Sequence, residues 1–164
     1  MSAIGFTLRR YTAADEDAAI ELWRRSWQHH YPHINFTERV AWWRERWRWE
    51  LVPHARVVIA EAGNAMIGFV TVDPQTHYLD QIVVAPEHWG AGVAQALLDE
   101  AKLLSPHGID LLVNKDNARA IRFYDKHGFA CAGEDKNPVS GKPVNRMRWA
   151  PRKAGEPRRI EPKP

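Results

Sequence analysis

The segment from Ile82 to Gln95 constrains the fold more than any other part of the sequence. It contains a short apolar stretch, a turn with Gly90 and Gly92, and the first residues of a helix. Apolar residues at helical spacing continue to Leu104, and after a Pro and Gly break a second apolar stretch runs over 109–113. Two strands joined through a helix form a crossover unit, so part of the fold is α/β.

The flanking segments predict antiparallel hairpins and further helices. The predicted strands span 6–10, 56–61, 65–72, 77–84, 109–113, 129–133 and 144–149, and the predicted helices begin near Thr12, Thr37, Ala91 and Asn117. Gly63 and Asn64 supply the turn between the second and third strands. We therefore predict a single α/β (α+β) domain over 1–150, in which one mixed, mostly antiparallel sheet of about seven strands is flanked by about four helices.

The composition excludes several classes of protein. The 164 residues are 45% hydrophobic and 26% charged, as in globular domains, and no apolar run approaches the roughly 20 residues that cross a bilayer. The N-terminus lacks the apolar centre of a signal peptide, and the single cysteine, Cys131, can form no intrachain disulfide. We therefore expect a cytoplasmic protein without membrane contact.

The net charge of +3 comes from the C-terminal tail. Residues 151–164 contain five Lys or Arg, two Asp or Glu and four Pro, and we expect this tail to be disordered. The neutral body argues against a nucleic-acid-binding domain, although the segment 42–49 interleaves aromatic and basic residues. His29, His30 and His33 lack a Cys or acidic partner at ligand spacing, so no metal site is expected.

The turn with two glycines favours anion binding. Glycines let a ligand approach the backbone closely, and a helix N-terminus presents N–H groups and a partial positive charge. Such a site suits a diphosphate. A tight strand-to-helix turn needs the same glycines for packing alone, so this motif by itself leaves both interpretations open.

A second pattern spans Val113 to Phe129. Asn117 and Tyr124 are seven residues apart, so they share one face of a helix and could present an amide and a phenol to one extended ligand. The alternative is an Asn that caps the helix and a Tyr that is half buried.

Together the two patterns resemble the GNAT acetyltransferase superfamily. The run Trp89-Gly90-Ala91-Gly92-Val93-Ala94 is similar to its Arg/Gln-x-x-Gly-x-Gly/Ala motif, except that Trp89 replaces Arg or Gln. The segment from Asn117 to Phe129 is similar to its Asn-x-x-Ala-x-x-Phe-Tyr-x-x-x-Gly-Phe motif. The resemblance covers the region from Val57 to Trp149 and implies an acetyl-CoA-dependent N-acetyltransferase.

The resemblance also implies roles for particular residues. The backbone of one strand would pair with the pantetheine arm, the glycine loop would hold the diphosphate, and Asn117 and Tyr124 would flank the thioester end. The strand residues are Ile82, Val83 and Val84, and the loop residues are Gly90, Ala91, Gly92, Val93, Ala94 and Gln95. Because backbone groups dominate this site, we expect binding to survive the change at Trp89.

Acetyl transfer to an amine requires removal of a proton from the amine, stabilisation of an oxyanion and protonation of a thiolate. Tyr124, a phenol with an ordinary pKa of roughly 10, is the predicted acid for the departing thiolate. A backbone N–H near Val83 is the predicted oxyanion donor.

Asp80 is the predicted carboxylate of the site. Tyr78, Asp80, Ile82 and Val84 alternate onto one predicted strand face. The resemblance implies a Glu, Asp or His base at a position equivalent to Tyr78 or Asp80. Asp80 either acts there, as a base or by orienting water, or it is a structural carboxylate, and the sequence leaves the two readings open. Cys131, in the strand after the last helix, is predicted to pack in the core rather than carry an acyl group.

The sequence does not identify the acceptor, which is a small-molecule or protein amine. Trp27, Tyr31 and Trp49 are the predicted substrate-binding residues, in an aromatic-rich region around the first two helices. Transfer would be direct within a ternary complex, in a monomer or a homodimer. The alternative is a GNAT-like domain that binds acetyl-CoA as a sensor without turnover.

Overall fold

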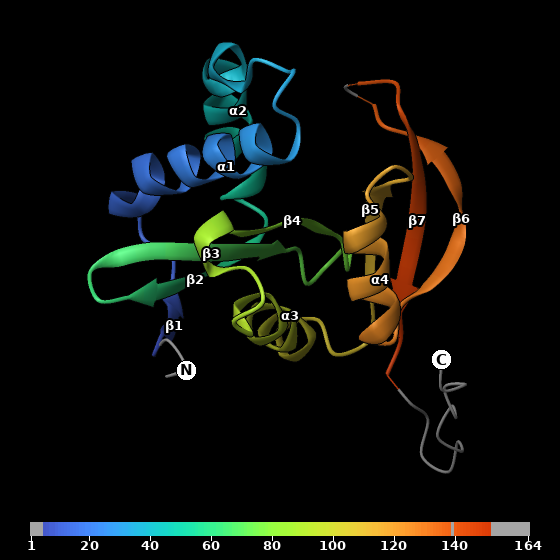
Figure 1. The fold of residues 1–164 in the computed structure, drawn as a ribbon. Coiled ribbons are helices and arrows are strands. Elements are labelled where there is room, and N and C mark those ends of the chain that lie inside the picture. Colours follow the sequence, from blue (N-terminus) through green and yellow to red (C-terminus); the bar gives the residue numbers. More distant parts are fainter. Residues whose placement is uncertain (1–4, 139, 152–164) are drawn as a thin grey trace.

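The structure is a computed structural model that describes residues 5–138 and 140–151 (Figure 1). The predicted disordered tail lies outside these residues, apart from Pro151.

Within the described residues, seven strands form two antiparallel sheets. They are β1 (Thr7–Arg10), β2 (Arg56–Ala62), β3 (Ala65–Val72), β4 (Leu79–Val84), β5 (Ile109–Asn114), β6 (Ala130–Lys136) and β7 (Pro143–Trp149). The first sheet has the order β1-β2-β3-β4 and the second has the order β5-β7-β6. The predicted turn at Gly63 and Asn64 joins β2 to β3, and the predicted fold class is confirmed.

Helices cover both faces of the first sheet. The α-helices are α1 (Glu16–His30), α2 (Val40–Arg46), α3 (Val93–Leu104) and α4 (Ala118–Lys126), with shorter turns η1 (Ala13–Asp15), η2 (Phe36–Arg39), η3 (Trp47–Leu51) and η4 (Pro86–His88). In Figure 1, α1 and α2 lie on one side of the first sheet, α3 lies on the other side, and α4 lies beside β5. The domain is therefore layered, with the central strands buried between helices.

Two apolar clusters fill the space between these layers. The α3-side core joins the sheets to α3 and α4 and contains Val84, Leu97, Leu111 and Phe129. The α1-side core contains the buried indoles of Trp23, Trp43 and Trp47, with Trp23 stacked on Trp43 at a ring-centroid distance of 4.6 Å. These tryptophans, at helical spacing, therefore lie on the buried faces of α1 and of the helical segment that begins with α2.

The sheet is split where one continuous sheet was expected. A single parallel bridge joins Tyr78, just before β4, to Asp110 at the start of β5. The N–H of Asp110 donates to the carbonyl of His77 at 2.8 Å. Within the described residues no further β-pairing joins these two strands, so β4 and β5 diverge from this point.

A β-bulge in β4 corrects the predicted strand face. Thr71 pairs with Gln81 and Val72 pairs with Leu79, so Asp80 is an extra residue in the ladder. Leu79, like Ile82 and Val84, packs on the α3-side core. Asp80 instead bonds to Arg46 of α2, on the opposite side of the sheet. The prediction that Asp80 shares a face with Ile82 and Val84 is therefore wrong, because a bulge interrupts simple alternation.

The predicted burial of Cys131 is also wrong. The thiol is exposed, because β6 is the outer strand of its sheet and has only β7 beside it. Almost every residue of β6 is exposed.

Gly68 of β3 lets α3 approach the sheet closely. A Cβ atom at this position would lie 2.9 Å from the carbonyl oxygen of Val83, 3.1 Å from Leu97 Cδ1 and 3.3 Å from Val93 Cγ1. The first neighbour is backbone and the other two are packed core side chains. A methyl group at position 68 can therefore fit only if β4 or α3 moves.

We predict that Gly68→Ala lowers the free energy of unfolding by about 1–3 kcal/mol, as overpacked core substitutions do. Urea unfolding measures this change. Gly5→Ala is the matched control, because a Cβ there meets nothing within 4 Å. Equal stability of Gly68→Ala and the wild-type protein would contradict the close packing of α3 on β3.

Candidate active site

The turn before α3 exposes its backbone. Gly90 and Gly92 have φ angles of 81° and 84°, in the left-handed region that favours glycine, and Gly92 caps α3. A Cβ at either position would meet nothing within 4 Å, so the space beside both glycines is open. The first residues of a helix have N–H groups without an intrahelical acceptor, and here these are Val93, Ala94 and Gln95. The geometry suits an anion.

The outer edge of β4 has unpaired main-chain groups beside this turn. The N–H of Ala85 donates to Ile67 at 2.8 Å, and Val83 pairs with Phe69 two residues earlier, so Val83 directs its N–H and carbonyl toward β3. Ile82 and Val84 therefore direct their N–H and carbonyl groups away from β3, into the opening between β4 and β5. An oxyanion donor on β4 would thus belong to Ile82 or Val84 rather than to Val83.

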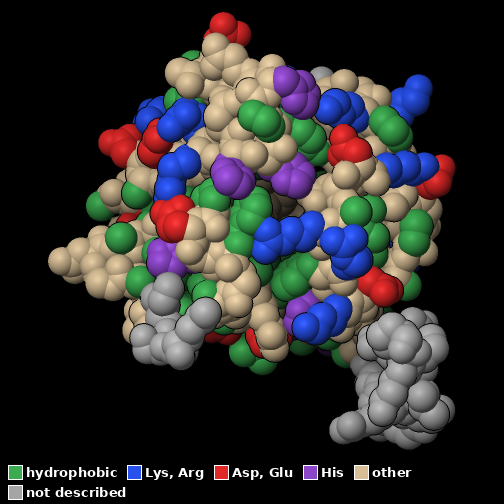
Figure 2. Space-filling model, in the orientation of Figure 1, with side chains coloured by type: hydrophobic (Ala, Val, Ile, Leu, Met, Phe, Trp, Pro, Cys, Tyr) green, Lys and Arg blue, Asp and Glu red, His purple; other side chains and the backbone are tan. Residues whose placement is uncertain are grey.

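Figure 2 shows a hollow in this face of the molecule, between β4 and α4, with His and Lys or Arg side chains at its rim. The glycine turn, the edge of β4 and α4 thus border one opening.

Asn117 is the N-cap of α4 and Tyr124 lies within this helix, but their side chains make different contacts. The Oδ1 atom of Asn117 accepts a hydrogen bond from the N–H of Ala120 at 3.1 Å, so Asn117 caps the helix. Tyr124 is only 6% exposed and packs between the rings of Phe123 and Phe129. Burial raises the pKa of Tyr124 well above its ordinary value, and the nearby phenol of Tyr78 raises it further. The phenol therefore stays protonated at neutral pH.

Asp80 forms a bidentate ion pair with Arg46. Nη1 of Arg46 donates to Oδ1 of Asp80 at 2.9 Å, and Nη2 donates to Oδ2. Gln81 Nε2 donates to the same Oδ1 at 3.0 Å, and the Arg46 guanidinium lies 5.4 Å from the ring centroid of Trp43. A carboxylate held in this way fits the structural reading of Asp80.

Tyr78 connects the two predicted catalytic residues. Burial and the neighbouring Asp80 carboxylate raise the pKa of Tyr78 to about 12, and Arg46 opposes the rise. Tyr78 thus interacts electrostatically with Tyr124, with Asp80 and with Arg46. The two predicted catalytic residues, Tyr124 and Asp80, are therefore both within electrostatic range of Tyr78.

Two of the three predicted acceptor residues lie together. Trp27 stacks on Tyr31 at 5.8 Å between ring centroids. The hydroxyl of Tyr31 accepts from Asn114 Nδ2 at 2.9 Å and donates to Asp116 Oδ1 at 3.0 Å, so the end of α1 is bonded to the end of β5. Trp49 lies on η3, is 66% exposed, and makes no ring contact with the other described aromatic residues.

Trp89, the departure from the motif, is anchored from three directions. Its Nε1–H donates to the carbonyl of Val84 at 2.9 Å. The guanidinium of Arg119 lies 4.2 Å from the centroid of its ring, and the His29 ring meets it edge-on at 5.1 Å. Helical periodicity carries no signal for such a contact, because the partners belong to three different elements.

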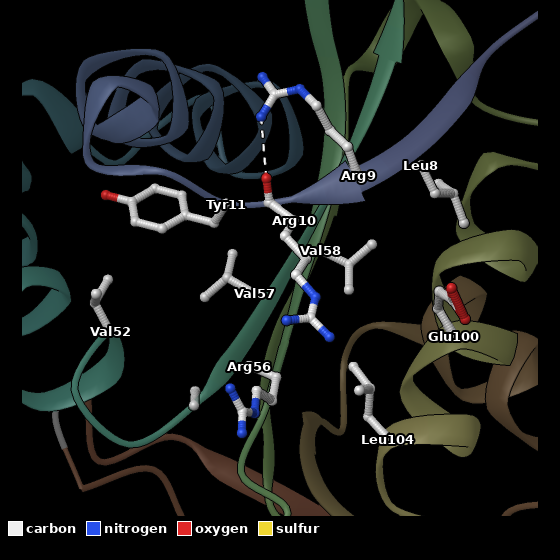
Figure 3. A pocket seen from close by; sticks show the side chains of 11 residues that line it. Leu8, Arg9, Arg10, Tyr11, Val52, Arg56, Val57, Val58, Glu100 and Leu104 are labelled. Carbon is white, nitrogen blue, oxygen red and sulfur yellow. Dashed lines mark hydrogen bonds between the residues drawn. The ribbon is translucent and has the colours of Figure 1, made fainter.

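A separate groove lies at the far end of α3. It has a volume of about 430 Å³, and Arg10, Arg56, Glu100 and Leu104 are among the residues that line it (Figure 3). None of the predicted site residues lines this groove.

No group of three or more His, Cys, Asp or Glu in 5–138 and 140–151 could hold a metal ion. In the same part of the chain no helix is both long and apolar enough to cross a bilayer.

Comparison with known proteins identifies the family. Residues 16–129 match the model of the acetyltransferase (GNAT) family. The chain belongs to this family. Peptidyl-lysine N-acetyltransferase YjaB of Salmonella typhimurium is 26% identical over 137 residues, which cover 83% of this chain and 91% of that protein. Spermidine N(1)-acetyltransferase of Vibrio cholerae is 33% identical over 88 residues, which cover 48% of this chain and 50% of that protein.

Solved GNAT structures share the fold. The PaiA N-acetyltransferase of Thermoplasma acidophilum, in complex with coenzyme A, superposes with a TM-score of 0.69 at 22% identity, covering 89% of this chain and 99% of that one. The chain is an N-acetyltransferase, and acetyl-CoA is its acetyl donor. The open cradle at Gly90 and Gly92 and the unpaired edge of β4 fit this co-substrate.

We predict that Asp80→Asn destabilises the protein by about 2–3 kcal/mol, because it leaves the charge of Arg46 without its partner in a mostly buried site. Adding Arg46→Met removes that charge and should restore most of the stability. If Asp80 is a structural carboxylate, the acetylation rate returns with the stability. Urea unfolding and thiol release, measured on the wild type, both single variants and the double variant, test this.

A stable double variant that remains about 100-fold slower than the wild type would contradict a purely structural role. Asp80 would then either position the reacting groups or act on the acceptor itself.

Proposed function

We propose that this GNAT enzyme transfers acetyl from acetyl-CoA directly to a primary amine in a ternary complex. One observation carries the proposal: the unpaired edge of β4 leads from the exposed N–H groups at the start of α3 to the neighbourhood of Tyr78 and Tyr124. A thioester arm laid along that edge would end where a phenol and a main-chain donor meet.

The backbone does most of the binding. Residues Gly90 to Gln95 donate N–H groups to the diphosphate, with the positive end of the α3 dipole behind them. The main chain of Ile82 and the N–H of Val84 pair with the pantetheine amides, while Val83 holds β4 to β3 and the carbonyl of Val84 accepts from Trp89 and Ser26. Gly92 also lets the chain enter α3 in a left-handed conformation with its backbone exposed.

The chemical step uses few side chains. The acceptor nitrogen forms a bond to the acetyl carbon, and the C–S bond breaks. The N–H of Ile82 or Val84 stabilises the oxyanion of the tetrahedral intermediate. Tyr124 gives its proton to the departing thiolate, and the proton lost by the amine restores the phenol through solvent. A phenol whose pKa is raised by burial remains able to donate over the whole neutral pH range.

Asp80 positions other groups of the site and does not act as a base. Its carboxylate is bonded to Arg46 and Gln81, which fixes the bulge of β4 at the residue next to Leu79. This arrangement aligns the acid with the main-chain donor. Reacting groups that are prealigned gain rate without further contacts.

An amine is the acceptor class that the relatives support, since they act on peptidyl-lysine and on spermidine. Trp27 and Tyr31 form one wall of the proposed acceptor site, next to Lys142, whose Nζ lies 4.8 Å from the ring centroid of Tyr31. Trp49 stays a weaker candidate because of its position on η3. A cytoplasmic location and a monomer or homodimer remain predictions.

We predict that Tyr124→Phe lowers kcat by about 100-fold while the dissociation constant for coenzyme A changes little, because general acids contribute on this scale and Phe keeps the ring packing. Thiol release from acetyl-CoA over a panel of lysine peptides, polyamines and amino acids measures the rate. Calorimetry with coenzyme A measures binding.

Phe123→Leu on the same helix is the control for packing. An unchanged kcat in Tyr124→Phe would remove Tyr124 from the chemical step. A wild-type protein that binds coenzyme A but releases no thiol with any amine would instead indicate a sensor.

A further inference from the structure

Trp89 stands where the GNAT motif has Arg or Gln, so the turn before α3 lacks the cation or amide that the motif supplies. Backbone N–H groups can bind a diphosphate without it. The observations around Trp89 nevertheless suggest how this chain replaces the missing charge.

The indole of Trp89 is fixed rather than mobile. Its Nε1–H donates to the carbonyl of Val84 at 2.9 Å, and the His29 ring lies edge-on at an interplanar angle of 86°. The ring also packs against the α3-side core. One face of the indole is therefore available at a set position beside the glycine turn.

The guanidinium of Arg119 lies over the indole ring of Trp89. Its guanidinium carbon lies 4.2 Å from the centroid of Trp89, and its helix, α4, forms the opposite side of the opening. The contact therefore spans the opening between the glycine turn and α4. An exposed cation–π contact of this kind is worth about 0.5–1 kcal/mol, enough to orient the side chain but not to neutralise it.

The charge of Arg119 is not compensated within the described residues. Carboxylates pair with Arg25, Arg46 and Lys115 near the same opening, whereas none lies within ion-pair distance of Arg119. A guanidinium held over a ring keeps N–H groups for a second partner, and a phosphate, whose oxygens can accept two parallel N–H bonds from the planar guanidinium, suits it.

We propose that Arg119, held on the indole of Trp89, is the cation that binds a phosphate group of coenzyme A in this enzyme. The inference rests on the proposed cofactor site. Trp89 is the positioning residue and Arg119 supplies the charge, so together they replace the Arg or Gln of the motif. The phosphate belongs either to the diphosphate at the glycine turn or to the 3′-phosphate of the ribose.

Calorimetry with coenzyme A and with 3′-dephospho-coenzyme A tests the proposal. Arg119→Gln is expected to weaken coenzyme A binding by about 10- to 100-fold, as for loss of a hydrogen bond to a charged group. The loss shrinks at high salt because the interaction is ionic. Arg122→Gln, an exposed Arg one turn later on α4, is the matched control and binds as the wild type does.

The two ligands separate the phosphates. If Arg119 binds the diphosphate, Arg119→Gln weakens both ligands equally. If it binds the 3′-phosphate, the effect of the variant disappears with 3′-dephospho-coenzyme A. Trp89→Leu is expected to lose about as much affinity as Arg119→Gln, with little further loss when the two are combined, since they act as one unit.

The variant Trp89→Arg/Arg119→Gln moves the cation back to the motif position and is expected to recover binding. Urea unfolding of each variant checks that the fold is kept. Wild-type affinity in Arg119→Gln, or a loss in Arg122→Gln of the same size, would overturn the inference. Failure of the wild-type protein itself to bind coenzyme A would instead overturn the proposed function.

Discussion

Strand β4 has a full partner along one edge and almost none along the other. It pairs with β3 along its length apart from the bulge at Asp80, whereas the one β-pairing toward β5 among the described residues is the bridge between Tyr78 and Asp110. Buried or half-buried main-chain groups need hydrogen-bond partners, so the edge at Ile82 and Val84 is completed by side chains, water or a ligand. Trp89 and Ser26 already bond to the carbonyl of Val84. The remaining groups explain why a ligand with amides along its length suits this opening.

Much of the fold could be predicted from local signals in the sequence. The glycine turn and the hairpin at Gly63 each depend on neighbours close in the chain, and each was predicted correctly. The cap at Asn117 was one of two readings, and the structure shows it directly. The comparisons confirm the GNAT family that two short motifs indicated together.

The remaining features depend on contacts between distant segments. The bulge at Asp80 is set by the pairing of β4 with β3, and it turns the carboxylate toward Arg46, 34 residues away. The exposure of Cys131 follows from the edge position of β6, which no local pattern reveals. The stacking of Arg119 on Trp89 joins a turn to a helix across an opening. Sequence patterns locate such residues but not their partners.

In the proposed binding mode, main-chain donors of β4 and α3 bind coenzyme A. Backbone amide resonances, followed by NMR during titration with coenzyme A, report on these donors one by one. The largest changes are expected at Gly90–Gln95, Ile82 and Val84, with a small change at Val83, whose N–H faces β3. Changes confined to the groove around Arg10 and Arg56, or no changes at all, would contradict it.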